Sequence, residues 1–570
     1  MLRDGAGARE LLVIIRSQSR SPAPPNPVSD HTTTSTAARR GELGWRVALW
    51  GGLLLTSLLL CAVPFLTAAG DTWLGLDWID GRKLYSIDDA YRFFVARNAF
   101  RLEAVFLWNY VLPLALSFDA TIAAITDGNL LVMRTVHAGI GILTLALIAR
   151  ASLKAGCGRV LALASVLIVG LMPLYLILSS SFYGEALFAF MVALAFMLLI
   201  EEKLTPLAVV IGLSPLVRPE GAIYCVLFLG YFALRRDATR CAYVALPGLI
   251  YLAAVVALSP DWQASMSWRL ELREILTPLD TGNAESISFD RLLSPLWAGL
   301  ALASLFMRRC RQWWPILVGP VCVIAIQAIG IARGVQDYEL RYYFSLIPIF
   351  GVAWALPIRG LLDSSAASPL RRNLIATVAG LGFLAIVTAH SLQSDWVRDL
   401  ATGRVTPRNV SSEYGDRALR FDPEPLRAFA GRVDAYVAAR DDVRTVFVAE
   451  HAPLYFLDFV RDDAQRELVL IPHDPGVAMY SGGFFFGFSL QRLAHRYYRF
   501  DPVENGPAVL IVNDRGGYQF FFPQTDAPNG VAANSQTVAA SIQSGSLKAF
   551  SVLPNSRDDV VWSIPDRTAR

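Results

Sequence analysis

Charged residues are scarce in this chain: Asp, Glu, Lys and Arg make up 17% of its 570 residues, whereas hydrophobic residues make up 54%. Ordinary soluble domains carry about 25% charged residues. This scarcity excludes a single water-soluble domain and indicates a membrane protein with lipids as partners. The net charge of +3 is too small to point to nucleic acid as a partner.

Cysteine pairs with metal-binding or redox spacing are also lacking. The six cysteines stand at positions 61, 157, 225, 241, 310 and 322, and no two of them form a Cys-x-x-Cys pair. They fall in apolar runs or in loops that we assign to the cytoplasm. We therefore expect no disulfide and no thiolate zinc site.

Long hydrophobic runs are what the chain has in abundance. A membrane-spanning helix needs about 20 apolar residues, and by this criterion residues 45–391 contain about eleven crossings. They are expected at 45–69, 129–150, 159–178, 184–200, 204–217, 221–234, 241–258, 291–307, 312–332, 342–358 and 373–391. Residues 104–118 are apolar, short and contain Pro113, which predicts an interfacial or re-entrant helix.

The distribution of basic residues predicts the orientation in the membrane. Arg and Lys gather in the loops near 150–159, 235–240, 308–311 and 359–372, which alternate with less basic loops. By the positive-inside rule these basic loops and the N-terminus are cytoplasmic. We expect a multi-pass protein of the plasma (inner) membrane, with the first outer loop at 71–103. A crossing by 104–118 would require this orientation to be reassigned.

The two ends of the chain differ in composition from the apolar middle. Residues 1–44 are rich in Ser, Thr, Pro, Ala and Arg, which predicts a disordered cytoplasmic tail. Residues 392–570 contain strand-like runs at 445–449, 467–471, 508–513 and 547–553, and helical patterns at 424–439 and 488–499. Strands that alternate with helices predict a soluble α/β domain, which we place outside the cytoplasm.

Two adjacent carboxylates, Asp88 and Asp89, follow the first span and lead an aromatic segment that includes Tyr91 and Arg92. Acids suit the N-terminus of a helix, and Ser86 and Asp89 have the spacing of a capping box. Capping accounts for one carboxylate and leaves the other without a structural reason. We therefore weigh a catalytic role for the pair equally with capping.

Three further clusters lie at the ends of predicted spans. Glu185 opens one span, where an unpaired acid would be unfavourable, so a functional site is the default hypothesis and an N-cap in the headgroup region is the alternative. Arg218 and Glu220 lie between two half-length helices, where a purely structural ion pair competes with phosphate binding by the guanidinium. Arg341 and Tyr342 open a late span, and taken alone they are typical of an interfacial belt.

Taken in order, these clusters resemble the motifs of the GT-C superfamily of membrane glycosyltransferases. The resemblance rests on Asp88–Tyr91, Gly184–Phe188, Val217–Gly221 and Arg341–Tyr342, and it extends over most of residues 45–391. Each motif alone is weak, whereas their order with matching spans between them is more specific. Residues 392–570 match only in architecture the domains that many such enzymes carry outside the membrane.

The resemblance implies transfer of a sugar from a polyprenyl-phosphate donor to an acceptor on the extracytoplasmic face, with inversion. The acceptor would be a hydroxyl or amine of a glycan, lipid or protein. A carboxylate of the first outer loop, Asp88 or Asp89, would act as general base or position the acceptor. Glu185 would correspond to the acidic residue that opens a later span near the site.

The same resemblance gives Arg218, Arg341 and Tyr342 to the donor phosphate, with Tyr91, Arg92 and Glu220 in support. No Asp-x-Asp motif is present, so a divalent cation held in that way is not indicated, although some family members use a metal, and Asp88, Asp89 and Glu185 could hold one. A transporter or flippase of a lipid-linked glycan is the competing hypothesis. It is ranked lower because no internal repeat is recognisable.

Overall fold

A computed structural model describes a large part of the chain. The described residues are 36–68, 78–79, 82–83, 87–100, 106, 112–258, 295–332, 344–364, 368–392, 423–439, 445–448, 454, 456–458, 467–470, 484–489, 495–499, 508–514, 517–523 and 547–552. The chain divides into two compact units, Met1–Val47 and Ala48–Arg570.

Helix α2 (Thr36–Ala68) begins inside the segment that was expected to be a disordered tail. The expectation for 1–44 is therefore wrong for its last nine residues. Ala, Arg, Glu and Leu dominate residues 37–43, and these are strong helix formers that extend the apolar helix backwards. Residues 1–35 lie outside the described part of the chain.

The described part of the chain is mostly helical. After α2 the helices are α3 (Ile87–Asn98), α4 (Pro113–Ile125), α5 (Leu130–Lys154), α6 (Gly158–Gly170), α7 (Pro173–Leu178), α8 (Gly184–Ile200), α9 (Leu204–Leu213), α10 (Gly221–Leu234), α11 (Ala238–Leu258), α13 (Pro295–Ala303), α14 (Trp314–Ala332), α15 (Ile347–Ala353), α16 (Ala355–Ser364), α17 (Pro369–Leu392) and α19 (Pro423–Ala438). Short 3-10 segments include η3 (Ser214–Leu216), η6 (Ser304–Phe306) and η7 (Arg308–Trp313).

Several of these helices have the length and composition of membrane spans. Leu130–Lys154, Ala238–Leu258 and Phe344–Asp363 are each long and apolar enough to cross a membrane. Six further apolar helices of 10–17 residues are shorter than a typical span. The helical membrane-protein character that the composition predicts is thus supported, and the count of about eleven crossings stays a prediction.

Three span boundaries differ from those expected. The run 159–178 is divided into α6 and α7, because Pro173 has no N–H with which to continue the first helix. The run 342–358 is helical from α15 to α16 and ends only at Ser364. The short helix expected at 104–118 is instead α4, since Pro113 occupies its first turn, where proline is favoured.

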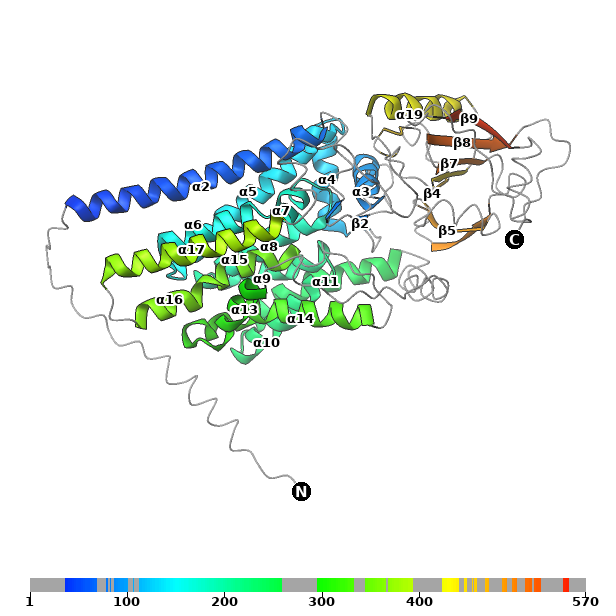
Figure 1. The fold of residues 1–570 in the computed structure, drawn as a ribbon. Helices are drawn as coiled ribbons and strands as arrows, with labels where there is room; N and C mark the ends of the chain where they lie inside the picture. Colours follow the sequence, from blue (N-terminus) through cyan, green and yellow to red (C-terminus); the bar gives the residue numbers. More distant parts are fainter. Residues whose placement is uncertain are drawn as a thin grey trace, which may run out of the picture. The chain divides into compact units, whose positions relative to one another are not determined.

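The core of the helical part is built around α15. All seven of its residues are buried, and it packs against α5, α6 and α8, as Figure 1 shows. Trp354, which follows it, is fully buried, and its indole N–H donates to Ser165 Oγ at 3.0 Å. Close packing of this kind, rather than exclusion of water, holds helices together in lipid.

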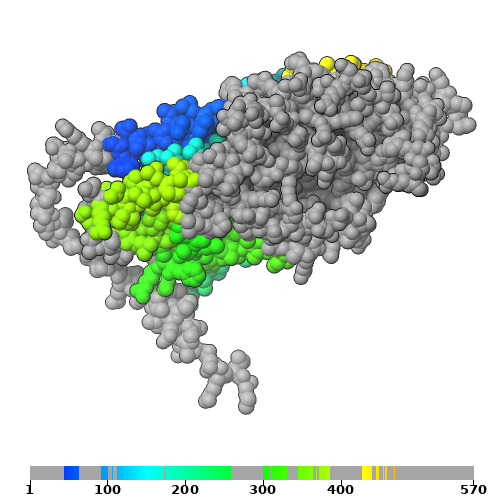
Figure 2. All heavy atoms as spheres, in the orientation of Figure 1, coloured from blue at the N-terminus to red at the C-terminus, as the bar shows by residue number. Residues whose placement is uncertain are grey.

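The outer helices expose apolar side chains. Leu54 and Leu58 of α2 are 61% and 59% exposed, and Val378 of α17 is 63% exposed. Figure 2 shows the described atoms of α2 in blue and those of α17 in yellow-green at the surface. Exposed apolar residues on this scale are expected where a protein faces lipid.

The C-terminal part contains a seven-stranded sheet in the order β6-β5-β4-β3-β7-β8-β9. Its strands are β3 (Thr445–Val448), β4 (Glu467–Leu470), β5 (Phe484–Ser489), β6 (His495–Arg499), β7 (Ala508–Asp514), β8 (Gly517–Pro523) and β9 (Leu547–Val552). The three central strands β4, β3 and β7 are parallel, and the outer pairs are antiparallel. A separate antiparallel pair is formed by β1 (Trp78–Ile79) and β2 (Arg82–Lys83).

One expected helix in this part is wrong. The run 488–499 ends β5 and forms β6, and these strands pair so that Phe485 lies opposite Tyr498 and Phe486 opposite Tyr497. Pairing with a neighbouring strand stabilises β6, and this tertiary interaction overrides the local helical pattern. The four strand-like runs coincide with β3, β4, β7 and β9, and the helical pattern 424–439 coincides with α19.

Candidate functional site

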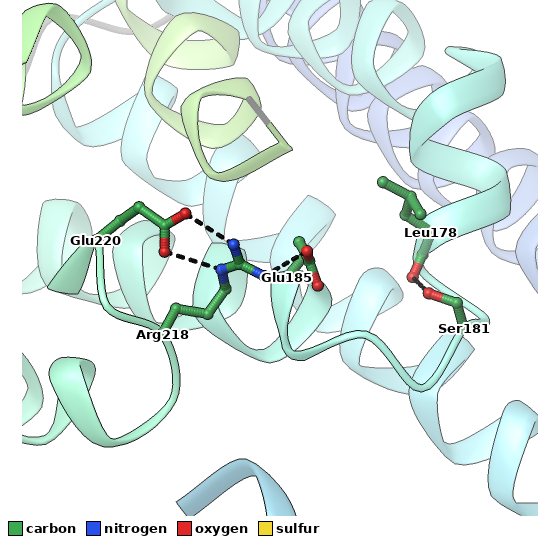
Figure 3. A network of polar contacts seen from close by, with 5 residues as sticks. All are labelled: Leu178, Ser181, Glu185, Arg218 and Glu220. Atoms are coloured by element: carbon green, nitrogen blue, oxygen red, sulfur yellow. Dashed lines mark hydrogen bonds and ion pairs between the residues drawn. The ribbon is translucent and has the colours of Figure 1, made fainter. Parts of the chain in front are cut away.

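A buried ion-pair network joins two distant parts of the chain. The Arg218 guanidinium donates to Glu185 through Nη1, and to Glu220 through Nε at 2.9 Å and Nη2 at 2.7 Å (Figure 3). The side chains of Glu185, Arg218 and Glu220 are 2%, 9% and 10% exposed. The network therefore consists of two carboxylates and one guanidinium that are shielded from bulk solvent.

The turn that presents Arg218 is fixed by the sequence around it. As expected, two short helices, α9 and α10, flank it. The Ser214 hydroxyl donates to the Ile211 carbonyl at 2.7 Å and lies 3.3 Å from the Gly221 carbonyl oxygen, across the turn. Irregular backbone between short apolar helices is tolerated in a membrane only where it is buried in protein or lines a wet cavity.

Burial of this network has an energetic consequence. Removing charges from water is unfavourable by several kcal/mol per ion, and only good pairing geometry offsets it. A guanidinium has five N–H donors, and at least three of the donors of Arg218 point to carboxylate oxygens. Arg218 therefore holds Glu185 and Glu220 in place in this state.

Glu185 lies in the first turn of α8, whose N-cap residue Tyr183 provides no side-chain cap. A carboxylate is favoured there because the exposed N–H groups make the helix N-terminus positive. The residues that lead into it, 179–185, form what we call the junction segment. Within it, the Ser181 hydroxyl donates to the Leu178 carbonyl at 2.8 Å and so satisfies the end of α7 (Figure 3).

Helix α3 meets the same junction segment. The Phe93 and Phe182 rings pack with their centroids 5.1 Å apart. The Arg92 guanidinium lies 5.7 Å from the Tyr183 ring centroid, which is cation–π range. A Cβ placed on Gly184 would lie 3.5 Å from Arg92 Nη1 and 3.2 Å from the Val217 carbonyl oxygen.

Three of the four sequence clusters thus come together at the junction segment: α3, Glu185 and the Arg218 turn. Asp88 and Asp89 occupy the first turn of α3, one turn before Arg92, and their side chains lie outside the described residues. Tyr91 is buried, with 1% of its surface exposed. Helix α3 is therefore largely packed inside the protein, since Phe93 and Phe94 are buried as well.

The fourth cluster, Arg341 and Tyr342, lies outside the described residues. The described chain resumes at Phe344, whose ring stacks on Tyr175 of α7 with centroids 5.5 Å apart. The Tyr175 hydroxyl donates to the Gly141 carbonyl at 2.6 Å. The start of this late helix therefore packs against α7 at Tyr175, which lies four residues before the first residue of the junction segment.

Sequence reasoning missed a second group of buried polar residues beside the junction segment. His137 Nε2 lies 2.7 Å from Asp119 Oδ1, and Arg134 Nη1 donates to the Ser180 carbonyl at 3.1 Å. Asp119, Arg134 and His137 are 4%, 1% and 2% exposed. For Arg134 and His137 the available signal was their position inside the apolar run 129–150, since ionisable residues within a membrane span indicate function by default.

A metal site is not assembled from the described side chains. Among them, no group of three or more His, Cys, Asp or Glu residues could hold a metal ion. The set that the sequence left open, Asp88, Asp89 and Glu185, includes two side chains outside that description. All six cysteines are free.

Comparison of the chain with protein-family models gives no match, and comparison with curated proteins gives none either.

Proposed function

We propose that the protein is a membrane glycosyltransferase that moves a sugar from a polyprenyl-phosphate donor to an acceptor hydroxyl. The observation that supports this most directly is the meeting of α3 with Glu185 and the Arg218 turn at the junction segment. The Arg218 turn lies more than a hundred residues after α3 in the sequence, and Glu185 lies between them. They bring acidic and basic side chains together beside apolar helices.

The reaction requires two kinds of group, a general base for the acceptor and positive charge for the leaving phosphate. The acceptor oxygen bonds to the anomeric carbon, the bond from that carbon to the phosphate oxygen breaks, and its electron pair leaves with the polyprenyl phosphate. The acceptor proton passes to a carboxylate, Asp88 or Asp89, acting as general base. A single displacement of this kind inverts the anomeric configuration.

The leaving phosphate needs positive charge rather than a proton. Arg92, Arg218 and Arg341 are the candidates, with Tyr342 beside the last. Since Arg218 already holds two carboxylates, it accepts a phosphate only by exchanging one of them or by using its remaining N–H donors. This makes Arg218 a group that orients Glu185 before the donor binds.

The proposed location follows from the basic loops. The N-terminus lies in the cytoplasm, the site opens to the extracytoplasmic leaflet, and residues 392–570 lie outside the plasma (inner) membrane. The acceptor is a glycan, lipid or protein. In a variant of the same mechanism, Asp88, Asp89 and Glu185 would hold a divalent cation.

The decisive experiment has two steps. The protein is purified with its native lipids, and any polyprenyl-phosphate sugar that accompanies it is identified by mass spectrometry. Transfer is then measured for Asp88→Asn, Asp89→Asn and the double variant, with Asp80→Asn from the same loop as a control. Loss of a general base lowers the rate by on the order of 100- to 10,000-fold. Normal transfer by the double variant would refute the assignment of the base.

A flippase for a lipid-linked glycan is the second candidate, and the pair of short helices around a buried Arg218 favours it, since transporters use interrupted helices. Reconstituted vesicles separate the two functions. Movement of the donor between leaflets with no change in covalent structure supports the flippase, whereas release of free polyprenyl phosphate supports the transferase.

A further inference from the structure

The second buried polar group has an arrangement of its own, centred on His137 of α5. Its Nε2 lies 2.7 Å from Asp119 Oδ1 of α4, and both residues are almost fully buried. An ionised carboxylate only accepts hydrogen bonds, so an Nε2–H of His137 is the donor in this contact. Among the residues that the structure describes, none donates a hydrogen bond to Nδ1.

The hydrogen bond fixes the plane of the imidazole ring between two phenylalanines. The ring meets Phe118 edge-on at 5.7 Å and Phe182 edge-on at 5.4 Å, with interplanar angles of 83° and 81°. Edge-to-face contacts depend on ring orientation. A rotation of His137 about its side chain would therefore lose both contacts together with the bond to Asp119.

Phe182 is the point at which these contacts reach the proposed site. Besides His137, it contacts Phe93 of α3 at 5.1 Å and lies 5.0 Å from the Arg134 guanidinium. Arg134 also donates to the carbonyl of Ser180, within the junction segment. Phe182 stands three residues before Glu185, so the ring anchors the junction segment from the α5 side while Arg218 holds it from the α10 side.

Since burial excludes substrate from His137 in this state, the pair acts on the site through the residues that it holds.

We propose that Asp119 and His137 are positioning residues that fix Phe182, and through it the placement of Glu185 and of α3. The expected loss of turnover rests on the proposed transferase function. The proposed placement of Phe182 by Asp119 and His137 does not depend on that function. It assigns a role to a buried acid–base pair that the sugar-transfer chemistry itself does not use.

The structural arm of the test uses the purified full-length protein without substrate. The chain has six histidines, so selective ¹⁵N-histidine labelling and the His137→Gln variant together identify the His137 signals. The expected spectrum has a protonated Nε2. A neutral ring with its hydrogen on Nδ1 alone would overturn the proposed bond to Asp119.

Hydrogen exchange then tests the positioning. The double variant Asp119→Ala/His137→Phe keeps an aromatic ring and removes both members of the pair, so neither the carboxylate nor the imidazole is left buried without the other, and the variant is expected to fold. We expect faster exchange confined to residues 179–185 and α3. Thr135→Ala, also on α5, removes a hydroxyl that donates to the Leu131 carbonyl of the same helix; it is the matched control and should change neither region. Unchanged exchange in the double variant, or a rise spread over all helices, overturns the proposal.

The catalytic arm uses membranes that contain the cell's own donor lipids. Turnover is read as release of polyprenyl phosphate, and donor affinity as binding of a sugar-free polyprenyl monophosphate. Misplacement of a reacting group by about 1 Å lowers the rate on the order of 100-fold. We expect such a loss of turnover in the double variant, with binding unchanged and with partial rescue in His137→Gln, whose amide can still donate to Asp119.

The two arms separate this inference from the proposed function. If the wild-type protein releases no polyprenyl phosphate, the transferase proposal fails, while the spectrum and the exchange pattern still decide whether the pair positions the junction segment. Equal losses of turnover and binding in the double variant, or no rescue by His137→Gln, contradict a positioning role.

Discussion

Gly221 lies directly against the backbone of Ser214, seven residues earlier in the chain. A Cβ built on Gly221 would lie 2.3 Å from the Ser214 carbonyl carbon and 2.5 Å from the Pro215 nitrogen. These atoms belong to the main chain and cannot move aside as a flexible side chain could. The glycine after Arg218-Pro219-Glu220 is therefore required by the packing of the turn.

Gly221→Ala should destabilise the protein by about 1–3 kcal/mol or more, as overpacking does in a close-packed interior. Gly230→Ala, on the same helix α10, is the matched control because no atom lies within 4 Å of its added Cβ. Alanine loses less conformational entropy than glycine when the helix forms, so Gly230→Ala should stabilise the protein by about 0.5–1 kcal/mol. Thermal unfolding in detergent measures both, and equal effects at the two positions would contradict the turn geometry.

Arg218→Met should be more damaging than loss of one ordinary contact, because it leaves Glu185 and Glu220 buried without their partner. Breaking a buried pair in this way costs about 3–5 kcal/mol. The triple variant Glu185→Met/Arg218→Met/Glu220→Met removes all three charges and should recover most of that stability. It should not recover sugar transfer. If the triple variant were as unstable as Arg218→Met, the loss of stability could not be explained by unpaired buried carboxylates.

Glu201, just beyond the end of α8, makes stability depend on pH. Hydrogen bonds from Lys203 and Arg150 lower the pKa of this carboxyl from 4.5 to about 2. A carboxyl that is harder to protonate in the folded state stabilises the fold above its ordinary pKa, and this contribution is lost as the pH falls through the folded value.

The difference in melting temperature between wild type and Glu201→Gln should therefore be constant above pH 4.5 and shrink between 4.5 and about 2. Since the Arg150 side chain is 58% exposed, added salt should reduce the difference at neutral pH. A difference that grows on acidification would contradict this assignment.

Tyr175→Phe should cost about 1 kcal/mol, because it removes one buried hydrogen bond and retains the ring. The lost bond is the one to the Gly141 carbonyl, and the stack on Phe344 remains. Tyr243→Phe, at a side chain that is 42% exposed, serves as the control and should leave the melting temperature unchanged. A loss of stability in the control alone would contradict the contribution given to the Tyr175 hydroxyl.

Much of the helical architecture could be predicted because lipid imposes a simple rule on sequence. A helix in a membrane satisfies its own backbone and must be apolar over about 20 residues, so runs such as 129–150 and 241–258 identify α5 and α11 directly. Boundaries were less predictable where proline decides, as at Pro113 and Pro173. The strand β6 was missed because its stability comes from pairing with β5, which local periodicity does not record.

The sequence by itself determined the apolar character of the chain and the identity of the clusters that hold Asp88, Glu185 and Arg218. Only the tertiary structure decided that Arg218 is held by two carboxylates, one of them 33 residues away, and that Phe182 joins α3 to the Asp119–His137 pair. The physical reason is the distance along the chain over which each kind of interaction acts. Hydropathy and capping act within one or two helical turns, whereas buried charges and aromatic rings acquire their partners only when distant helices pack together.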